Sequence, residues 1–338
     1  MRQIVIPRAG APEILEIREA PTPTAAAGQV LIDVRAIGVN FADIMARKGL
    51  YQDAPPFPCV VGYEVSGVVN AVGSGVSRVK PGQRVLAMTQ FQGYSTQVCV
   101  PEGQVFAIPD SLPFAEAASI PVVYSTAWAL LMAMGSLRKG DTLLIQNAGG
   151  GVGLAAIDIA RQVGATTIGT ASGRKHEFLR SRGLDHAIDY RTQNFEDEVM
   201  RLTQGRGVEL IIDPMGGEYW KRNYKVLRST GRLGMFGAST MTEARTKVGA
   251  IAKMAVNMPL YNPVGLMNGN KGVFGVNMGH MWHETEMVSR WIGEIVAGLQ
   301  AGWVRPYVDK TFPFEQAAEA HAFIEGRGNM GKVILTVG

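Results

Sequence analysis

The chain has 338 residues, of which 46% are hydrophobic and 18% are charged, and its formal net charge is +4. This balance is typical of a folded globular protein and excludes an intrinsically disordered chain. The positive excess is small, and no run of five like charges occurs, which argues against a nucleic-acid-binding protein. Because a chain of this length exceeds what one hydrophobic core usually organises, we expect two domains.

The cysteines and the apolar segments indicate the compartment. Cys59 and Cys99 stand in apolar, strand-like contexts, and we expect both to be reduced, buried thiols in a cytoplasmic protein. The amino terminus, MRQIVIPRAG, lacks the hydrophobic core of a secretory signal. No uninterrupted apolar stretch reaches about 18 residues, so we expect no insertion into a membrane.

The first third of the chain has the pattern of a β-rich domain. Alternating or β-branched runs predict strands in QIVI, LEIREA, QVLIDVRAIGV, VSGVVNAVG, RVLAM and TQVCV. After Pro113 the apolar residues recur at helical spacing, in LPFAEAASIPVVYSTAWALLMAMGSL.

Strands and helices then alternate along the chain. The predicted order is TLLIQN, a helix over 152–163, TTIGTA, a helix over 174–182, HAIDY, a helix over 195–203, VELIIDP, a helix near 218–227, GRLGMFG and GVFGV. This alternation predicts a parallel, doubly wound sheet that binds its ligand at the carboxyl ends of the strands. The tail, from MVSRWIGEIVAGLQAG onward, predicts helix, strand, helix and strand without a core of its own, and we expect it to complete the first domain.

A glycine cluster, NAGGGVG, joins the strand TLLIQ to the helix over 152–163 and fits the pattern Ala148-x-Gly150-x-x-Gly153. Glycine at Gly150 lets a pyrophosphate approach the backbone, and Gly153 lets the helix pack closely on the strand. The helix N-terminus offers unpaired N–H groups and a positive dipole end to the phosphate. We therefore predict a dinucleotide site that includes Gly151 and Val152; an ordinary strand-to-helix turn is the alternative.

The end of the next strand distinguishes the two nicotinamide dinucleotides. An NAD site usually places an acid about 20 residues beyond the glycines. This sequence has Ser172, Arg174 and Lys175 there, with no carboxylate before Glu177. Because a 2′-phosphate requires cationic, hydrogen-bonding partners, NADPH is favoured. The alternative is that Arg174 and Lys175 only begin a solvated helix.

Three segments, in this order, resemble the medium-chain dehydrogenase/reductase superfamily, and within it the zinc-free quinone oxidoreductase group: GVNFADIMARKGLY (38–51), VVGYEVSGVVNAVGSGVSRVKPGQRV (60–85) and the glycine turn. NKGVFGVNMGHMW resembles the vesicle amine transport protein branch of that group. The resemblance implies an α/β protein. A GroES-like, β-rich catalytic domain would cover 1–122 and 278–338, and a Rossmann NADP-binding domain with a doubly wound parallel sheet would cover 123–277. The active cleft would lie at their junction.

The sequence departs from the zinc-dependent relatives at the positions of their metal ligands. Those relatives present a Cys in the region of Asn40 and a His within a Gly-His-Glu motif, which here is Gly62-Tyr63-Glu64. A catalytic zinc needs three protein ligands and an open position, and neither Asn40 nor Tyr63 suits it. We expect no metal. The five histidines, His176, His186, His280, His283 and His321, show no metal-ligand spacing with cysteines or acids.

The resemblance also implies roles for individual residues. Tyr51 would border the substrate cleft and orient a carbonyl oxygen or relay a proton, with a packed aromatic residue as the alternative. Asn40 and Thr126 would lie near the nicotinamide, and Tyr190 near the adenine or its phosphate. Asp43 is expected to cap a helix rather than to tune chemistry. The remaining cofactor-binding candidates, Phe236, Gly237, Phe274, Val276 and Asn277, follow or belong to the last two strands of the sheet.

The resulting hypothesis is NADPH-dependent reduction of a quinone or an α,β-unsaturated carbonyl compound. A zinc-type alcohol dehydrogenase and a non-catalytic nicotinamide-binding scaffold are the alternatives. Relatives often form homodimers by pairing the last strand of the Rossmann sheet, here GVFGV, across a two-fold axis. The methionines clustered over 241–287 either line a plastic apolar pocket or fill helix cores.

Overall fold

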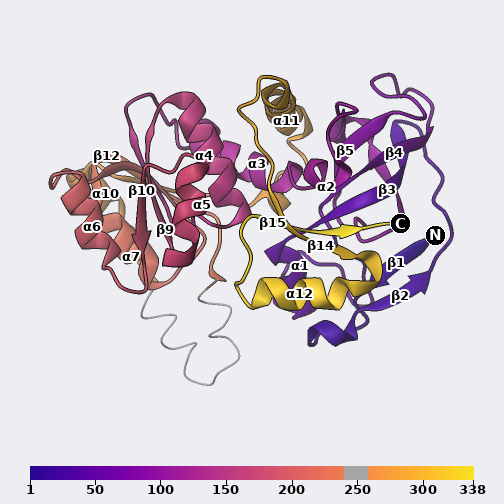
Figure 1. Cartoon of the computed structure of the whole chain (residues 1–338), viewed down its shortest axis with the longest axis horizontal. Coiled ribbons are helices and arrows are strands. Elements are labelled where there is room, and N and C mark those ends of the chain that lie inside the picture. The colour runs from indigo at the N-terminus through magenta and orange to yellow at the C-terminus, as the bar shows by residue number, and fades with distance from the viewer. Residues whose placement is uncertain (240–257) are drawn as a thin grey trace. The chain divides into compact units, whose positions relative to one another are not determined.

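The computed structural model of the chain describes residues 1–239 and 258–338, which form two compact units (Figure 1). The first unit comprises Met1–Ser125 and Met278–Gly338, and the second comprises Thr126–Asn277. The sequence places the first boundary after residue 122, whereas the structure divides the chain after Ser125, inside helix α3 (Pro121–Trp128).

The first unit is built around a seven-stranded sheet with the order β14-β15-β3-β4-β5-β7, in which β6 also pairs with β3. A separate hairpin pairs β1 with β2. The strands are β1 (Arg2–Val5), β2 (Glu16–Glu19), β3 (Gln29–Val39), β4 (Glu64–Val72), β5 (Arg84–Met88), β6 (Gln97–Pro101), β7 (Val105–Ala107), β14 (Val308–Pro313) and β15 (Lys332–Thr336). The helices are α1 (Phe41–Arg47), α2 (Phe114–Ala117), α11 (Thr285–Gln300) and α12 (Ala317–Glu325), with short 3-10 turns at Pro12–Ile14, Glu102–Gln104, Met278–His280 and Phe314–Gln316.

The carboxyl-terminal tail completes this unit, as the sequence predicts. Strand β15 pairs antiparallel with β3, and Ile334 lies opposite Gly38. Helix α12 carries His321 into the core, where its Nε2 lies 2.9 Å from the hydroxyl of Tyr94. The same hydroxyl donates to the Asp43 carboxylate at 3.3 Å. Burial lowers the pKa of His321 to about 3, so the ring is neutral near pH 7 and adds no charge to the core.

The second unit has a parallel sheet whose described strands run in the order β10-β9-β8-β11-β12-β13. The strands are β8 (Thr142–Ile145), β9 (Thr166–Ala171), β10 (His186–Asp189), β11 (Val208–Asp213), β12 (Leu227–Met235) and β13 (Gly272–Gly275). The helices are α4 (Gly151–Val163), α5 (His176–Ser181), α6 (Phe195–Leu202), α7 (Glu218–Lys225) and α10 (Pro263–Gly269), with a π-helical turn at Ala129–Ala133 and a 3-10 turn at Gly173–Lys175. In chain order this is 3-2-1-4-5-6, the arrangement of dinucleotide-binding sheets, with its switch point between β8 and β11.

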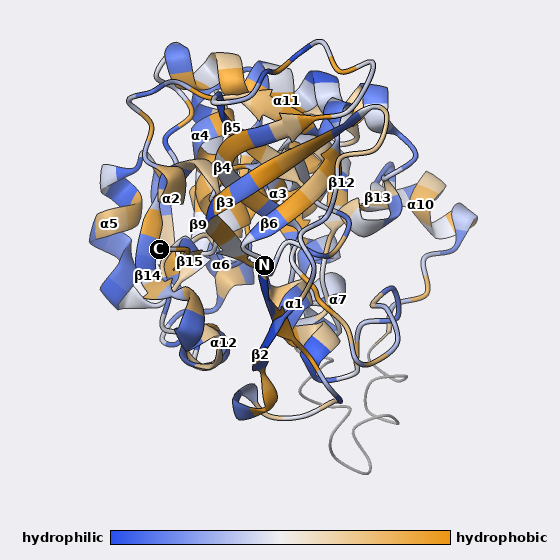
Figure 2. Cartoon of the chain, turned by 90° about the vertical axis from the view of Figure 1, so that its right-hand side faces the viewer, coloured by the Kyte–Doolittle hydropathy of each residue, from blue (hydrophilic) through white to orange (hydrophobic). Residues whose placement is uncertain are grey.

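The hydrophobic pattern explains these elements. Strands of the second sheet are apolar on both faces because helices cover both, and Leu143, Leu144 and Ile145 have no exposed surface. Residues 153–160 of helix α4 are all buried, and the helix ends at Val163 with the C-cap Gly164, whose φ of +82° glycine adopts readily. Figure 2 shows the hydrophobic residues concentrated in the strands and hydrophilic residues on outer helices such as α5.

A buried polar chain supports the carboxyl ends of three neighbouring strands in the second unit. Gln146, which follows β8, donates to Asn223 at 2.7 Å and accepts from Thr170 of β9 at 2.7 Å. Asn223 in turn donates to Asp213 at the end of β11, at 2.8 Å. Because each of these buried groups has a partner, this row of hydrogen bonds holds the three strand ends in place beside the glycine turn.

Several details differ from the sequence-based expectations. Helix α10 was not predicted; its signals are the cap Asn262, whose side chain accepts from Gly265 N–H, and Pro263 at the first helical position. The predicted helix over 174–182 begins as a 3-10 turn. Cys59 is buried as expected, but Cys99 is only partly buried. Within the methionine cluster, Met241 and Met254 lie outside the described residues.

One helical segment, Phe114–Ala133, is long and apolar enough to cross a membrane by length and composition alone, although Glu116 interrupts it. Most of its most apolar window, 72%, is buried inside the protein. Core helices of folded domains share this property, so the segment is explained by packing.

Candidate active site

The glycine turn lies at the switch point of the second sheet, at the carboxyl end of β8. Strand β8 ends at Ile145, and α4 begins at Gly151 with Gly150 as its N-cap residue. Ala148 N–H donates to the Thr170 carbonyl at 3.0 Å, which ties the turn to β9. The first N–H groups of α4, including those of Gly151 and Val152, have no acceptor within the helix and point out of its N-terminus, where an anion is favoured.

The glycines of this turn differ in their packing requirements. A Cβ at Gly153 would lie 2.5 Å from the carbonyl oxygen of Ala148 and 2.7 Å from its Cα, so helix and turn are in backbone contact there. A Cβ at Gly150 would lie 2.9 Å from Asn147 Nδ2, at the end of a side chain, and 3.4 Å from the Asn147 carbonyl oxygen, at the limit of ordinary van der Waals contact. Packing therefore demands glycine at 153 but not at 150.

Lys175 covers the turn from the side of β9. A Cβ at Gly149 would lie 2.8 Å from Lys175 Cδ and 3.5 Å from its Nζ, and the Lys175 side chain is 9% exposed. The ammonium group is thus held beside the backbone amides of the glycine turn. A phosphate placed on those amides would find a cation within reach.

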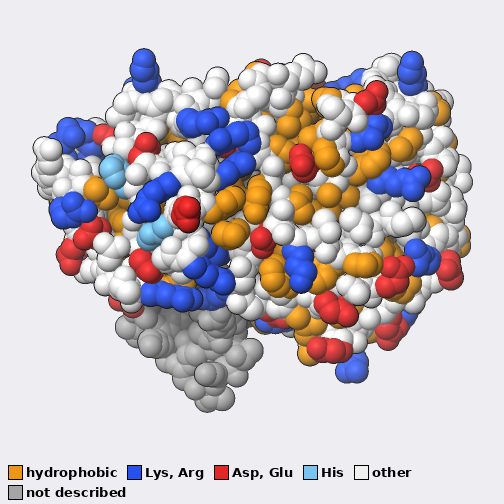
Figure 3. Space-filling model, in the orientation of Figure 1, with side chains coloured by type: hydrophobic (Ala, Val, Ile, Leu, Met, Phe, Trp, Pro, Cys, Tyr) orange, Lys and Arg blue, Asp and Glu red, His pale blue; other side chains and the backbone are white. Residues whose placement is uncertain are grey.

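The residues predicted to read the 2′-phosphate lie at the ends of two adjacent strands. Strands β9 and β10 are parallel, and Ala171 lies opposite Asp189. The register therefore places Ser172 beside Tyr190, just beyond the carboxyl ends of the strands. Arg174 is exposed on the turn after β9, and Tyr190 is 49% exposed. On the face shown in Figure 3, Lys and Arg side chains gather over the region of α4 and α5.

An acid also lies at this edge, which the sequence analysis did not consider. Asp189 Oδ2 accepts from Gly173 N–H at 3.0 Å, and its Oδ1 accepts from Arg191 N–H at 3.0 Å. Both oxygens are engaged by backbone amides, so Asp189 shapes the turn that carries Arg174.

Most other predicted cofactor residues of the second unit also follow strand ends. Phe236 and Gly237 follow β12, and Val276 and Asn277 follow β13. Because the strands are parallel, their carboxyl ends share one edge of the sheet with the glycine turn. Phe274 differs: it lies within β13, and its ring packs where a Cβ of Gly234 would be, at 2.7 Å. Thr126 lies on α3 and is buried.

In the first unit, Asn40 belongs to a buried charged cluster. Its Nδ2 donates to Glu64 Oε1 at 2.9 Å and to the Gly38 carbonyl at 3.3 Å. Its Oδ1 accepts from Lys332 Nζ at 2.8 Å. The Lys332 ammonium also lies 2.6 Å from Glu64 Oε1, and both side chains are buried. A Cβ at Gly38 would overlap the Glu64 carboxylate, so glycine is required at that position.

The Glu64 carboxylate has one further partner. Its Oε2 accepts from Val122 N–H at 2.7 Å, in the first turn of α3. A carboxylate at a helix N-terminus satisfies an unpaired N–H group and interacts favourably with the helix dipole. Glu64 thereby connects β4, the end of β3, the start of α3 and the last strand of the chain.

This cluster does not fit a catalytic zinc. The Lys332 ammonium already lies against Glu64 and Asn40, and a second cation there would be repelled. Tyr63 offers a phenol whose pKa burial raises far above its ordinary value, so it stays protonated. Among the residues that the structure describes, no group of three His, Cys, Asp or Glu side chains is placed to hold a metal ion. The residues at the zinc positions of zinc-dependent dehydrogenases are thus the wrong donors.

Asp43 serves as the predicted capping residue of α1. Its Oδ2 accepts from Asn40 N–H at 2.8 Å, and its Oδ1 accepts from Gly62 N–H at 3.1 Å. Burial raises the pKa of Asp43 to about 7, partly offset by the Asn40 hydrogen bond and the Lys332 charge. The side chain fixes both the turn at Asn40 and the glycine that precedes Tyr63.

Tyr51 and Tyr63 form an aromatic pair beside this turn. Their ring centroids are 6.2 Å apart with an edge-to-face angle of 83°, and Phe91 packs against Tyr63 at 5.4 Å. Burial and then the nearby Asp53 charge raise the pKa of Tyr51 above its ordinary value. The Tyr63 hydroxyl is buried without a hydrogen-bond partner among the described residues. Both phenols are therefore neutral hydrogen-bond donors near pH 7.

The sequence analysis missed two members of this site. Lys332 lies in the tail segment GKVILTV, far along the chain from Glu64, and no local pattern links them. Tyr63 was judged only as a poor zinc ligand. Tyr63 stands where zinc-dependent relatives have the histidine of Gly-His-Glu. A residue at the position of a metal ligand faces the same part of the site, so this position indicates that Tyr63 belongs to the site.

Comparison with known proteins agrees with the observed fold. Residues 26–110 match the model of the alcohol dehydrogenase GroES-like domain, and residues 182–335 match that of the zinc-binding dehydrogenase family. The rat synaptic vesicle membrane protein VAT-1 homolog is 38% identical over 326 residues, covering 96% of this chain and 80% of the relative. Rat quinone oxidoreductase is 30% identical over 339 residues, covering 99% of this chain and 97% of the relative.

Solved structures give the same result. The CurK enoyl reductase superimposes with a TM-score of 0.88 at 26% identity, covering 100% of this chain and 99% of that structure. The Escherichia coli quinone oxidoreductase complexed with NADPH has a TM-score of 0.87 at 26% identity, covering 99% of this chain and 100% of that structure. With a GroES-like unit, a doubly wound dinucleotide-binding unit and these full-length relatives, the chain belongs to the medium-chain dehydrogenase/reductase superfamily, as one of its oxidoreductases.

Proposed function

We propose that this protein is an NADPH-dependent, zinc-independent oxidoreductase that transfers hydride to a quinone or an α,β-unsaturated carbonyl acceptor. The observation that carries the proposal is the glycine turn, where Gly150 is free of any packing requirement and Lys175 lies over the neighbouring Gly149. Quinone oxidoreductases and enoyl reductases among the similar proteins support the acceptor class.

The second unit would hold NADPH through three groups of contacts. The amides of Gly150, Gly151 and Val152 would bind the diphosphate at the start of α4. Arg174 and Ser172 would bind the 2′-phosphate, with Tyr190 beside them at the end of β10. The Lys175 ammonium, held against the glycine turn, would contact the diphosphate as well as the 2′-phosphate side. NADPH complexes of two structural neighbours are in keeping with this assignment.

In the first unit, Tyr51 would act on the acceptor. When bound, the dihydronicotinamide supplies a hydride to the electron-poor carbon of the acceptor, and negative charge develops on the carbonyl oxygen. Without a metal, a hydrogen-bond donor must stabilise that charge. The Tyr51 hydroxyl is protonated near pH 7, and Tyr63 holds its ring edge-on. Tyr51 would donate this hydrogen bond, and the final proton would come from Tyr51 or solvent.

Asn40 would contribute as an acceptor only. Its two N–H groups are directed to Glu64 and to the Gly38 carbonyl, and Lys332 occupies one lone pair of its Oδ1. One lone pair remains. Asn40 would therefore accept a hydrogen bond from a ribose hydroxyl or a carboxamide N–H, and it would have no proton to give to the substrate.

The function is tested by following NADPH oxidation with quinones, enones, enals and enoyl thioesters. We expect turnover with at least one class, and we expect Tyr51→Phe to lower kcat by about 10²-fold or more while KM for NADPH changes little, because one oxyanion donor contributes that much. Ile17→Glu, an exposed change in the first unit, is the control and should keep wild-type kcat. NADPH binding without oxidation by any acceptor would instead favour the non-catalytic scaffold.

The glycine turn is tested by a pair of alanine variants. Gly150→Ala should keep its melting temperature within about 2 °C, because only the Asn147 side chain must shift, and should raise Kd for NADPH by about tenfold or more. Gly153→Ala should lower the melting temperature by several degrees, because overpacking against backbone costs about 1–3 kcal/mol.

Gly293→Ala, where the added Cβ meets open space, is the control for the glycine variants. Its melting temperature and its affinity for NADPH should both match the wild type. Unchanged NADPH affinity in Gly150→Ala would refute diphosphate binding at this turn.

Cofactor choice is tested by removing the two cations separately. Arg174→Ala should weaken NADPH binding by about tenfold and leave NADH binding unchanged, because only NADPH carries the 2′-phosphate. Lys175→Ala should weaken both cofactors, because its ammonium lies beside the turn that would hold the diphosphate. Arg180→Ala, an exposed change on α5, should affect neither. Tighter binding of NADH than NADPH by the wild type would refute the proposed cofactor.

We also propose that the protein is a cytoplasmic homodimer that does not insert into membranes. Strand β13 pairs with β12, and no other strand of residues 1–239 and 258–338 pairs with its second edge. Beside it, Val264 and Met267 of α10 are 60% and 69% exposed. A second copy paired at this edge would cover them.

Sedimentation equilibrium tests the dimer. We expect a dimer for the wild type and for the Ile17→Glu control. The double variant Val264→Glu, Met267→Glu should shift the protein to monomer, because it places charges on the apolar surface beside β13. A monomeric wild type at micromolar concentration would contradict the proposal.

A further inference from the structure

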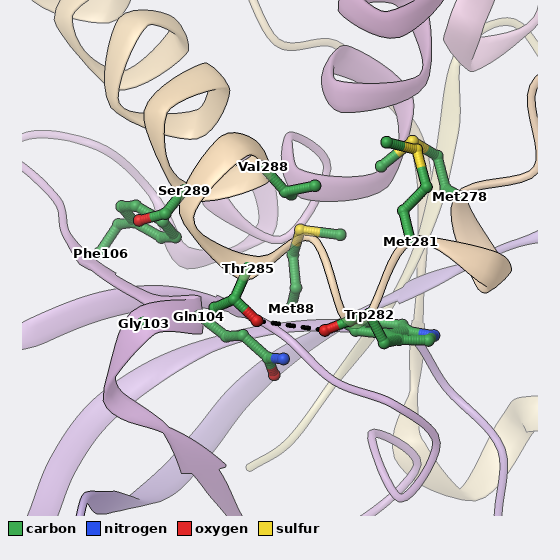
Figure 4. A pocket seen from close by; sticks show the side chains of 10 residues that line it. All are labelled: Met88, Gly103, Gln104, Phe106, Met278, Met281, Trp282, Thr285, Val288 and Ser289. Atoms are coloured by element: carbon green, nitrogen blue, oxygen red, sulfur yellow. Dashed lines mark hydrogen bonds between the residues drawn. The ribbon is translucent and has the colours of Figure 1, made fainter.

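The first unit contains a hollow between the β5–β7 side of its sheet and helix α11, shown in Figure 4. About 330 Å³ of space free of protein atoms lies in and above it, and this space includes open solvent. Apolar side chains make most of its wall: Met88, Phe106, Met278, Met281, Trp282 and Val288. Three of these are methionines, which can change rotamer to admit a flexible ligand.

The polar groups of the hollow are few and uncharged. Thr285 Oγ1 donates to the Trp282 carbonyl at 3.1 Å, and Ser289 accepts from Arg78 at 3.4 Å. The Gln104 carboxamide is the remaining polar side chain among the described residues of the wall. No Asp, Glu, Lys, Arg or His lines the hollow.

The charge at its rim is balanced. The Arg78 guanidinium lies over the Phe106 ring, 5.5 Å from its centroid, and Glu102 accepts hydrogen bonds from the backbone N–H groups of Ser77 and Arg78. One cation and one anion therefore lie at the same edge. An uncharged ligand suits these surroundings better than an anionic one.

The hollow adjoins the residues to which we assign the chemistry. Met88 lies directly opposite Glu64 in the β4–β5 pair, so their side chains share one face of the sheet beside Asn40. At the other side, Met278 and Met281 flank His280, whose Nε2 lies 2.9 Å from Asp53 Oδ2. Asp53 is two residues from Tyr51. A ligand whose carbonyl meets Tyr51 thus has an apolar recess close by.

We propose that this hollow is a subsite for the apolar chain of the acceptor, so that the preferred substrates are uncharged enones or quinones that carry a flexible alkyl substituent. The inference rests on the proposed function for the position of the reacting carbonyl. Each methylene buried in the hollow should contribute about 0.8 kcal/mol, which corresponds to about a fourfold gain in kcat/KM. The gain should stop when the hollow is full.

The first test is a series of 1-alken-3-ones from butenone to dodecenone, assayed with NADPH. For the wild type, we expect kcat/KM to rise by about fourfold per methylene over several methylenes and then to level off. Met281→Glu should reduce the ratio of kcat/KM between nonenone and butenone by about tenfold or more, because a charge in the hollow opposes an alkyl chain. Val288→Phe, which fills the hollow without adding charge, should make the series level off at a shorter chain. The Ile17→Glu control should keep the wild-type ratio.

The second test does not depend on turnover. Undecan-2-one, which lacks the alkene, is titrated into the protein while tryptophan fluorescence is recorded. We expect a saturable change that Trp282→Phe removes and that Met281→Glu weakens by about tenfold or more. The Ile17→Glu control should bind undecan-2-one as the wild type does.

The outcomes separate this proposal from the proposed function. Turnover of butenone with no dependence on chain length overturns the subsite and leaves the reductase in place. Absence of turnover with every acceptor overturns the reductase, and the undecan-2-one titration then decides the subsite by itself. Binding that Met281→Glu and Val288→Phe leave unchanged overturns the subsite in either case.

Discussion

Lys332, on the last strand of the chain, places its ammonium 2.6 Å from the Glu64 carboxylate, and both groups are buried. Each charge would cost several kcal/mol to bury alone, and removing one partner of such a pair costs about 3–5 kcal/mol. The remaining atoms of the pair bind Asn40 and the first turn of α3. The turn after β3 and the start of α3 are therefore held by a strand that the chain supplies last, so the first unit cannot complete its site before its tail is in place.

The same ion pair determines which chemistry remains possible. It puts a fixed positive charge next to the position where zinc-dependent dehydrogenases hold a metal. Glu64 accepts from one N–H of Asn40, and the Gly38 carbonyl accepts from the other. Neither Lewis-acid chemistry nor proton donation by Asn40 fits these contacts. In the proposed reaction, stabilisation of an oxyanion would then fall to neutral donors, and burial keeps the phenols of Tyr51 and Tyr63 protonated.

The elements that the sequence predicts well are those whose signal is local. Both-face burial leaves Leu143–Ile145 of β8 and Leu210–Ile212 of β11 as apolar runs, and such strands alternate with helices along the chain, so a parallel sheet is predicted from local patterns. Helix α10 escapes prediction because it is short, contains three glycine or asparagine residues and buries no side chain. The contact of Lys332 with Glu64 escapes for another reason: it joins distant segments, and pairing of that kind leaves no local pattern.

The two glycines of the turn have different structural requirements, so they support different conclusions about the protein. Gly153 would be glycine in any protein that packs this helix on this turn, because a Cβ there meets the backbone of Ala148. Gly153 is therefore evidence for the fold and gives no evidence for a ligand. Gly150 would tolerate a side chain at the cost of moving Asn147, so the fold does not explain it. A group outside the chain that needs close approach to the backbone does explain it, and a diphosphate at the N-terminus of α4 is such a group. Gly150, which packing does not require, is therefore the residue of this turn that most favours the proposed nucleotide site.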